Sequence, residues 1–425
     1  MKNKTFFTLL LFLLLFSCTA KTEKALIPEP VSQSPVSSGQ FELEQNYHEQ
    51  AARIASSLDD RLLASQVIIA GIDGKTHLNG EMRALLWECP VGGIMLFSYN
   101  IAAKKEQIKR FLSECSNWVT EAGGARLEAQ GIPVFQDGSP QGALAQGTLV
   151  PFIAVDHEGG PVHRFGNAAE KLPAPFSYWG LAQCEGIEKA LVRIEEDSFR
   201  SANEIRDLGI TMNFAPVAEF LTGENSLFLE DRSYGPDPVF TAAASAAFIR
   251  GMEKAGVTCV VKHFPGNAGP DPHKSPSVLE GDRAALDFMV SPFAALIHDV
   301  PALMISHSVV PAWDNDTNAS LSHAIMGDWL RGELGYQGII ITDDFSMGAV
   351  KNTGKPGAGI APGRAAVKAL IAGADMVLTW PPDIRKTHRE IMAALASGEI
   401  SRERLREAAE RIIFEKIRRG LINAE

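Results

Sequence analysis

The stretch Gly338-Ile-Ile-Ile-Thr-Asp-Asp-Phe-Ser-Met347 decides the fold class, because a short β-branched run ends directly in two carboxylates. In a parallel α/β barrel the carboxyl ends of all strands meet at one mouth, where polar residues face a substrate and the preceding apolar residues pack the interior. Asp343 is the first residue after this run. On its own, Asp343 or Asp344 could equally cap the following helix, as aspartates at such turns often do. The rest of the chain decides between the two interpretations.

Seven further segments have the character of barrel strands. They are short, apolar and nearly continuous, which is typical of strands buried on both faces, and they lie at 67–70, 93–97, 152–156, 211–215, 258–263, 302–307 and 375–380. Amphipathic helical patterns occur between them, at 104–120, 188–208, 238–255, 282–298, 322–334 and 364–372. This alternation predicts a single (β/α)8 barrel of the TIM type. An open doubly wound sheet is the alternative, but residues 70–74 do not match the G-x-G-x-x-G loop that it would need.

The amino terminus predicts export and attachment to a membrane. Lys2 and Lys4 precede an apolar run at 6–16 that is too short to span a bilayer, which is typical of a signal peptide. Leu15-Phe-Ser-Cys18 is similar to a bacterial lipobox, whose cysteine carries the lipid; a cleaved signal with an incidental cysteine is the alternative. We expect a signal peptide at 1–18, a flexible polar tether at 19–45 and a barrel domain at 46–425, held by lipid at Cys18 in a bacterial cell envelope.

The composition excludes some partners and cofactors. A net charge of -11, with no basic cluster, argues against nucleic acid, whose binding needs a cationic face. The cysteines after the tether lack C-x-x-C spacing, which favours free thiols over a zinc site or a disulfide framework. His157 and His163 flank a Gly-Gly turn rather than forming a metal-binding pattern. We therefore predict no metal and no cofactor.

Polar residues at other strand ends support the barrel interpretation of Asp343. Asp156 follows one apolar run, Arg164 lies a few residues later beyond a Gly-Gly corner, and Lys262 and His263 end another run. A single lysine or histidine at such a position is usually a solvated or structural residue. Together, at one mouth, they could donate hydrogen bonds to neighbouring sugar hydroxyls while a carboxylate accepts from two hydroxyls.

Several motifs together resemble glycoside hydrolase family 3 over residues 60–380. They are Asp156-His-Glu-Gly-Gly, Asn213-Phe-Ala-Pro-Val, Asp231-Arg-Ser-Tyr-Gly, Lys262-His-Phe-Pro-Gly, Ser306-His and Thr342-Asp-Asp-Phe-Ser-Met. The resemblance is closest to the bacterial beta-N-acetylglucosaminidases, or beta-hexosaminidases, of peptidoglycan recycling. It implies a retaining mechanism in which Asp343 attacks the anomeric carbon, and a sugar subsite lined by Asp156, Arg164, Arg232, Lys262, His263 and His307. It also implies a monomer of the single-domain kind, without a second α/β domain.

A retaining glycosidase needs a second group that protonates the leaving oxygen and later deprotonates water. In the N-acetylglucosaminidase branch this group is a histidine paired with an aspartate on a mobile loop, and the resemblance assigns the role to Asp271-Pro-His273. The unperturbed pKa of a histidine, about 6.5, suits both steps. This loop departs from the family in Pro272 and in the lead-in at 265–270. If His273 were not the acid, Glu158 or Glu219 would be the next candidates.

Three functions remain open at this point. We favour an exo-acting beta-N-acetylglucosaminidase that acts on cell-wall fragments or related glycans, because Asp343 and the Asp271/His273 pair are both present. A family 3 beta-glucosidase or beta-xylosidase is the first alternative. A surface lipoprotein that binds sugar without turnover is the second, and the altered acid loop is its support.

Overall fold

The computed structural model describes residues 38–132, 134–135, 144–145, 149–269, 271–347 and 359–423. Its centre is a ring of eight parallel strands: β1 (Ile68–Gly71), β2 (Gly93–Leu96), β5 (Phe152–Val155), β6 (Met212–Asn213), β7 (Thr258–Phe264), β8 (Ala302–Ile305), β11 (Ile339–Thr342) and β12 (Val377–Thr379). Each strand pairs with the next one along the chain, and β12 pairs with β1. A parallel bridge between Ile341 and Met376 closes the ring. The predicted (β/α)8 barrel is therefore confirmed.

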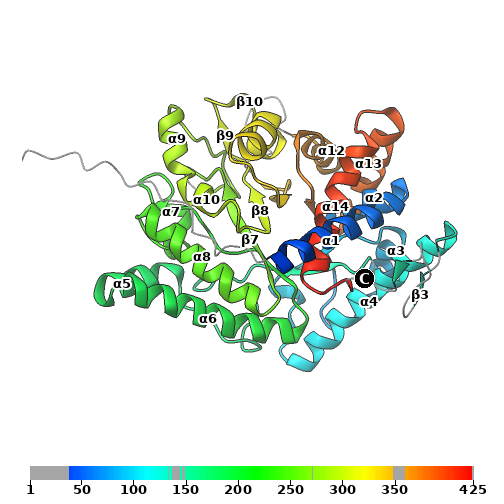
Figure 1. Ribbon diagram of the computed structural model, residues 1–425, viewed down its shortest axis with the longest axis horizontal. Coiled ribbons are helices and arrows are strands. Elements are labelled where there is room, and N and C mark those ends of the chain that lie inside the picture. The colour runs from blue at the N-terminus through cyan, green and yellow to red at the C-terminus, as the bar shows by residue number, and fades with distance from the viewer. Residues whose placement is uncertain are drawn as a thin grey trace, which may run out of the picture.

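Helices surround the barrel in Figure 1. They include α3 (Gly80–Glu88), α4 (Lys105–Ala129), α5 (Pro175–Glu185), α6 (Ile187–Leu208), α8 (Pro238–Lys254), α9 (Arg283–Met289), α10 (Ser291–Leu296), the π-helical η4 (Ala324–Glu333), α12 (Pro362–Ala372) and α13 (Ile384–Ser397). The expected helix at 282–298 is divided into α9 and α10, because Pro292 has no backbone N–H and starts a new helix. Short elements connect the rest: α2 (Asp60–Gln66), η1 (Ser98–Asn100), α7 (Ser226–Leu229), η2 (Glu230–Arg232), η3 (Ala319–Leu321), η5 (Pro381–Asp383) and the strand pairs β3 (Val134–Phe135) with β4 (Leu144–Ala145) and β9 (Val309–Val310) with β10 (Asp314–Asn318).

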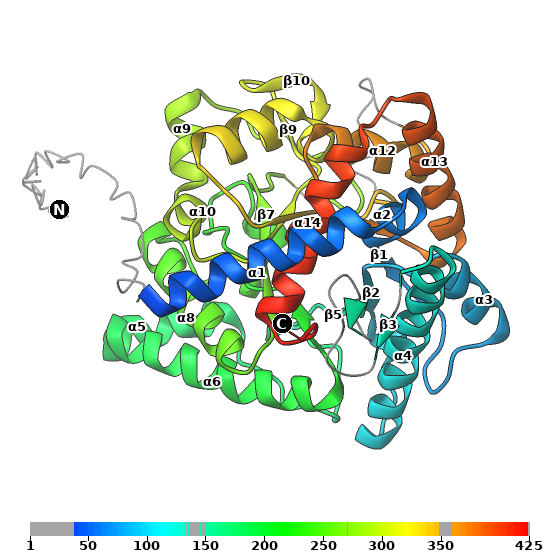
Figure 2. The ribbon, with the colours of Figure 1, turned by 45° about the vertical axis from the view of Figure 1, so that its right-hand side comes forward.

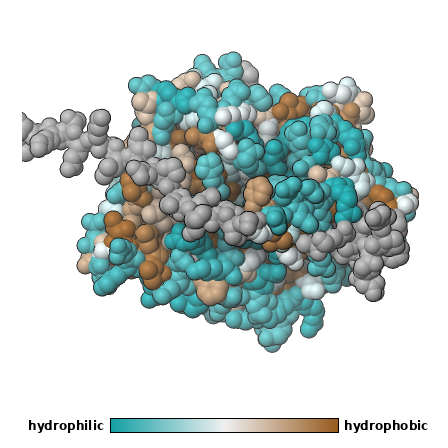
Figure 3. All heavy atoms as spheres, in the orientation of Figure 1, coloured by the Kyte–Doolittle hydropathy of each residue, from teal (hydrophilic) through white to brown (hydrophobic). Residues whose placement is uncertain are grey.

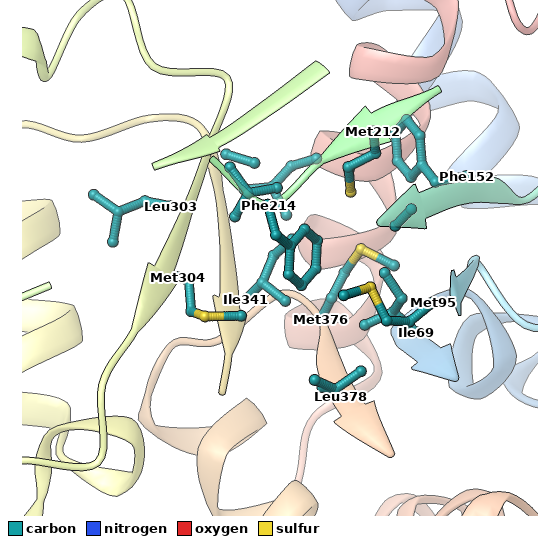
Figure 4. Packing of buried hydrophobic residues seen from close by; sticks show 14 of the residues in the cluster. Ile69, Met95, Phe152, Met212, Phe214, Leu303, Met304, Ile341, Met376 and Leu378 are labelled. Carbon is teal, nitrogen blue, oxygen red and sulfur yellow. The ribbon is translucent and has the colours of Figure 1, made fainter. Parts of the chain in front are cut away.

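Apolar side chains fill the inside of the barrel. In Figure 4, Met304, Ile341 and Met95 point from different strands toward the ring of Phe214, whereas Leu303 points outward. All five side chains are buried, because alternate residues of each strand pack inside the barrel and the others pack against the surrounding helices. This double burial explains why the strands are continuous apolar runs in the sequence.

Two helices cover the end of the barrel opposite to the mouth. Figure 2 shows α1 (Ser38–Ser57) crossing α14 (Arg402–Arg418), and the rings of His48 and Phe414 stack with their centroids 3.9 Å apart. Helix α14 lies under the amino-terminal ends of the strands: Thr258 Oγ1 donates a hydrogen bond to Glu415 Oε1 (2.8 Å), and Lys416 Nζ donates to Gln66 Oε1 (3.0 Å). This end of the barrel is therefore closed, and substrate access is left to the mouth.

The expected tether is too long at its carboxyl end. Helix α1 begins at Ser38, so residues 38–45 are helical and not part of a flexible segment. Glutamates and glutamines favour a helix, and the packing of the later turns of α1 on α14 extends it toward the amino terminus. Cys18, the predicted signal peptide and residues 19–37 of the predicted tether lie outside the described residues. Among the residues described, no helix is long and apolar enough to cross a membrane.

The face of the barrel domain seen in Figure 3 is mainly polar. Figure 3 shows hydrophilic residues over most of the face seen in Figure 1, with hydrophobic residues gathered near its left edge.

Four cysteines are free thiols: Cys89, Cys115 and Cys259 are buried and Cys184 is exposed. Burial raises the pKa of Cys89 to about 11, so this thiol stays protonated at neutral pH.

Candidate active site

The residues predicted from strand ends lie at one end of the barrel. Asp156 follows β5, Lys262 and His263 lie near the carboxyl end of β7, His307 follows β8 and Asp343 follows β11. Because all the strands are parallel, their carboxyl ends open on the same mouth. The position of each side chain is thus fixed by the barrel itself rather than by a loop.

A buried cluster of charges forms one side of this mouth. Lys262 Nζ lies 2.7 Å from Asp156 Oδ1 and 2.6 Å from Glu158 Oε1. Arg232 binds Glu158 with two hydrogen bonds of 2.8 Å, and Arg164 Nη2 lies 3.4 Å from Asp156 Oδ2. Four residues of the predicted subsite are therefore brought together, and Glu158 joins Lys262 to Arg232.

Both carboxylates of this cluster are ionised at neutral pH. Burial alone would raise the pKa of Glu158, but the charges of Lys262 and Arg232 outweigh it and hold that pKa well below its usual range. Burial is likewise outweighed for Asp156, whose pKa is lowered by Lys262 and Arg164. Ionised carboxylates accept hydrogen bonds and carry no proton to donate. Glu158 is thus a poor candidate for a general acid.

The turn that leads from Asp156 to Arg164 requires glycine. Gly159 and Gly160 have φ values of 98° and 52°, in the left-handed region that favours glycine. A Cβ atom on Gly159 would lie too close to the carbonyl oxygen of Pro173. This Gly-Gly corner lets the chain reverse and return Arg164 to Asp156.

His263 is held by a carboxylate that the sequence did not place in the subsite. Its Nδ1 atom lies 2.6 Å from Glu219 Oε1, and Asn267 donates its backbone N–H to Glu219 Oε2 (2.6 Å) and its amide to Oε1 (3.2 Å). Only 4% of Glu219 is exposed. Glu219 therefore orients the ring of His263, and neither it nor Glu158 is free to reach a leaving group.

Asp343 and Asp344 have different surroundings. The carboxylate of Asp344 accepts hydrogen bonds from Ser346 N (2.8 Å) and from Trp380 Nε1 (2.7 Å). The carboxylate of Asp343 accepts one, from Asp344 N to Oδ1 (2.8 Å), and forms no other with the part of the chain that the structure describes. Asp343 is also partly exposed. Asp344 thus maintains the turn, while Asp343 presents an oxygen to the mouth.

His307 contacts the same turn. Its Nε2 atom lies 3.0 Å from the carbonyl oxygen of Asp344, and its Nδ1 atom lies 2.7 Å from Ser320 Oγ. Burial lowers the pKa of His307, against the opposing charge of Asp343. His307 is therefore neutral at physiological pH and lies directly beside the turn that carries Asp343.

The predicted pair on the loop after β7 is present. His273 Nδ1 lies 2.7 Å from Asp271 Oδ1, and the backbone N–H of His273 donates to the same oxygen (3.0 Å). Slight burial would raise the pKa of Asp271, but these two hydrogen bonds lower it. The side chain of His273 is 62% exposed. Its Nε2 atom has no partner among the described residues and can exchange a proton.

Phe228 connects this loop to the charged cluster. Its ring centroid lies 6.2 Å from that of His273 and 6.1 Å from that of His263, and the guanidinium of Arg232 lies 5.0 Å above it. Phe228, Glu158 and Glu219 are the residues of this region that sequence reasoning did not assign to the subsite. Glu158 could have been found, because it lies two positions after Asp156 in the same motif. Phe228 offered no such signal.

The chain matches a known family over most of its length. Residues 61–414 match the model of the glycosyl hydrolase family 3 N terminal domain. A beta-hexosaminidase of Stenotrophomonas maltophilia (strain R551-3) is 30% identical over 325 residues, covering 75% of this chain and 84% of that protein. A beta-hexosaminidase of Alkalilimnicola ehrlichii is 32% identical over 317 residues, covering 73% and 79%.

This chain is also similar to a solved structure. The glycoside hydrolase family 3 beta-N-acetylglucosaminidase from Paenibacillus sp. str. FPU-7 superposes with a TM-score of 0.72 and 29% identity over 86% of this chain. The chain spans only 63% of the length of that protein. The overall fold is therefore shared with that protein.

Proposed function

This chain belongs to glycoside hydrolase family 3, and we propose that it is a retaining exo-beta-N-acetylglucosaminidase. Its substrate would be terminal β-linked N-acetylglucosamine on cell-wall fragments or related glycans. The observation that carries the proposal is the Asp271–His273 hydrogen bond of 2.7 Å on the loop beside the charged cluster. The names of the two bacterial relatives support the same activity.

In the first step, Asp343 attacks the anomeric carbon and His273 donates a proton to the glycosidic oxygen. The bond to the leaving group breaks, and the sugar remains as an ester on Asp343. In the second step, His273 removes a proton from water, and the resulting hydroxide displaces Asp343 from the anomeric carbon. Asp271 holds the imidazole ring through its hydrogen bond with Nδ1, which leaves Nε2 to face the glycosidic oxygen.

The charged cluster would bind the terminal sugar. Asp156 is partly exposed at the mouth, so its carboxylate can accept hydrogen bonds from two hydroxyls. Lys262, Arg164 and Arg232 can donate to the same hydroxyls, while His263 and His307 complete the wall. Because ion pairs already hold these side chains in place, little conformational entropy is lost when the sugar binds.

Glu158 and Glu219 are already bound to other side chains, which disfavours the glucosidase and xylosidase alternative. Those relatives usually take a carboxylic acid as the proton donor, and both nearby candidates are buried and hydrogen-bonded. The non-catalytic alternative is disfavoured by the accessible carboxylate of Asp343.

Aryl β-glycosides of N-acetylglucosamine, N-acetylgalactosamine, glucose and xylose test these alternatives directly. The purified protein should hydrolyse the N-acetylglucosaminide fastest. Asp343→Ala should lose turnover and stay folded, and Asp316→Ala, an exposed aspartate of β10, is the matched control that should keep it. A preference for the glucoside or xyloside, or no turnover of any glycoside, would contradict the proposal.

We further propose that the enzyme acts as a monomer, exported and anchored by lipid at Cys18 in the bacterial envelope. The support is the basic start, the short apolar run and the lipobox-like Leu15-Phe-Ser-Cys18. The monomer is what the resemblance to the single-domain members of the family implies.

A further inference from the structure

The charged cluster occupies only part of the barrel mouth. On the opposite arc, where β12, β1 and β2 end, the side chains are aromatic. The rings of Trp380, after β12, and Phe97, after β2, stack with centroids 4.6 Å apart, and the ring of Tyr99 in η1 stacks on Phe97 at 5.8 Å. None of these three rings has a role in the reaction described above. We call them the aromatic platform.

The platform is connected to the turn that carries Asp343. Trp380 Nε1 donates to Asp344 Oδ2 (2.7 Å), and the backbone N–H of Asp344 donates to Asp343 Oδ1 (2.8 Å). Only one residue therefore separates the indole from the proposed nucleophile. The platform is thus joined to the turn of the proposed nucleophile, on the arc of the ring opposite to β6 and β7.

The end of β1 leaves room for the rings. Gly71 is the last residue of β1, and a Cβ atom there would lie 3.2 Å from Trp380 Cε3 and 3.6 Å from Phe97 Cε2. The first of these contacts is tighter than ordinary van der Waals contact, so a side chain at this position would displace the indole. The glycine therefore allows both rings to lie over the strand end.

The platform is also held rigidly. Buried Asn100 donates from its side-chain amide to the carbonyl oxygens of Ile72 (2.9 Å) and Gly74 (2.8 Å), and its Oδ1 accepts from the backbone N–H of Phe97 (3.0 Å). These bonds fix η1 to the segment after β1. Tyr99 nevertheless stays 49% exposed. Rigid, solvent-facing aromatic rings next to a polar pocket are typical of ligand-binding surfaces.

We propose that the aromatic platform binds the leaving-group sugar, so that the enzyme acts on oligosaccharides whose second residue is a pyranose ring. This inference rests on the proposed function. The faces of a pyranose carry C–H bonds with partial positive charge, and the face of an aromatic ring is negative, so the two attract and exclude water. Trp380 lies nearest the cleaved bond, and Tyr99 forms the outer end of the platform.

The test compares two substrates with similarly poor leaving groups. One is a β-1,4-linked disaccharide of N-acetylglucosamine, which reaches the platform, and the other is methyl β-N-acetylglucosaminide, which does not. Tyr99→Ala should lower kcat/KM for the disaccharide by about fivefold, within the range of one aromatic contact. Its kcat/KM for the methyl glycoside should change by less than twofold. Tyr99→Phe keeps the ring and should retain disaccharide hydrolysis.

Phe41→Ala is the matched control, because Phe41 is a 64% exposed aromatic residue on α1, far from the mouth. It should affect neither substrate. Equal effects of Tyr99→Ala on both substrates, or no effect on either, would overturn the platform proposal while leaving the proposed function intact. Failure of the wild-type protein to hydrolyse both substrates would instead refute the proposed function.

Discussion

The burial of Lys416 beneath the barrel predicts a measurable dependence of stability on pH. Its ammonium lies under the strands with no exposed surface, 3.0 Å from Gln66 Oε1 and 5.3 Å from the ring centroid of Phe152. No carboxylate of the described residues pairs with it. Burial lowers the pKa of Lys416 from 10.5 to about 7. At a pH between these two pKa values, the unfolded chain binds a proton at Lys416 that the folded protein does not bind. The free energy of unfolding therefore rises with pH in this range.

The free energy of unfolding rises by up to about 1.4 kcal/mol per pH unit, and by roughly 2 kcal/mol in total between pH 7 and 9. Lys416→Met removes this group and keeps most of its volume. Urea unfolding of both proteins at pH 7, 8 and 9 should therefore show that the advantage of the Met variant shrinks as pH rises. Lys189→Met, which changes a 71% exposed lysine of α6, is the control and should show no such trend. A difference between wild type and Lys416→Met that stays constant from pH 7 to 9 would refute the reasoning.

Three other predictions concern the acid loop, the barrel end and the anchor. His273→Ala should slow glycosides with poor leaving groups by about 100-fold or more, and aryl glycosides with good leaving groups much less at bond cleavage; equal slowing would be inconsistent with a general acid. Asp375→Asn should lower the free energy of unfolding by about 3–5 kcal/mol, because the carboxylate binds Arg331 (2.6 Å) and two further arginines in the interior, and urea unfolding measures this loss. Cys18→Ser should release the protein from membranes in fractionation with high salt and carbonate, and a variant that still sediments would rule out lipid as the sole anchor.

The sequence predicted the barrel well because its strands are buried on both faces. The runs at 339–341 and 259–261 are therefore apolar at every position, and the polar residues that follow them mark the mouth. Helix α1, which begins inside the expected tether, was not predicted because it packs against α14, more than 350 residues later in the chain. Local patterns contain no information on such contacts.

In the active site, too, local sequence patterns could not show contacts between residues far apart in the chain. Asp156, Lys262 and Asp343 could be found because each lies at the carboxyl end of a recognisable strand. The hydrogen bond between Trp380 and Asp344 joins residues 36 positions apart, and no sequence pattern near either residue indicates it. The roles of Glu158 and Glu219 likewise depend on which cations and amides surround them after folding.

Mass spectrometry of the glycosyl-enzyme tests the central claim most directly. In His273→Ala, an aryl N-acetylglucosaminide with a good leaving group should still react with the nucleophile, but water attack should be slow because its base is missing. The ester should then accumulate. We predict that rapid quenching and peptide mapping will find one N-acetylglucosaminyl residue attached to Asp343. Attachment to another residue, or turnover with no covalent adduct at any time point, would contradict the assignment of Asp343 as the nucleophile of a retaining enzyme.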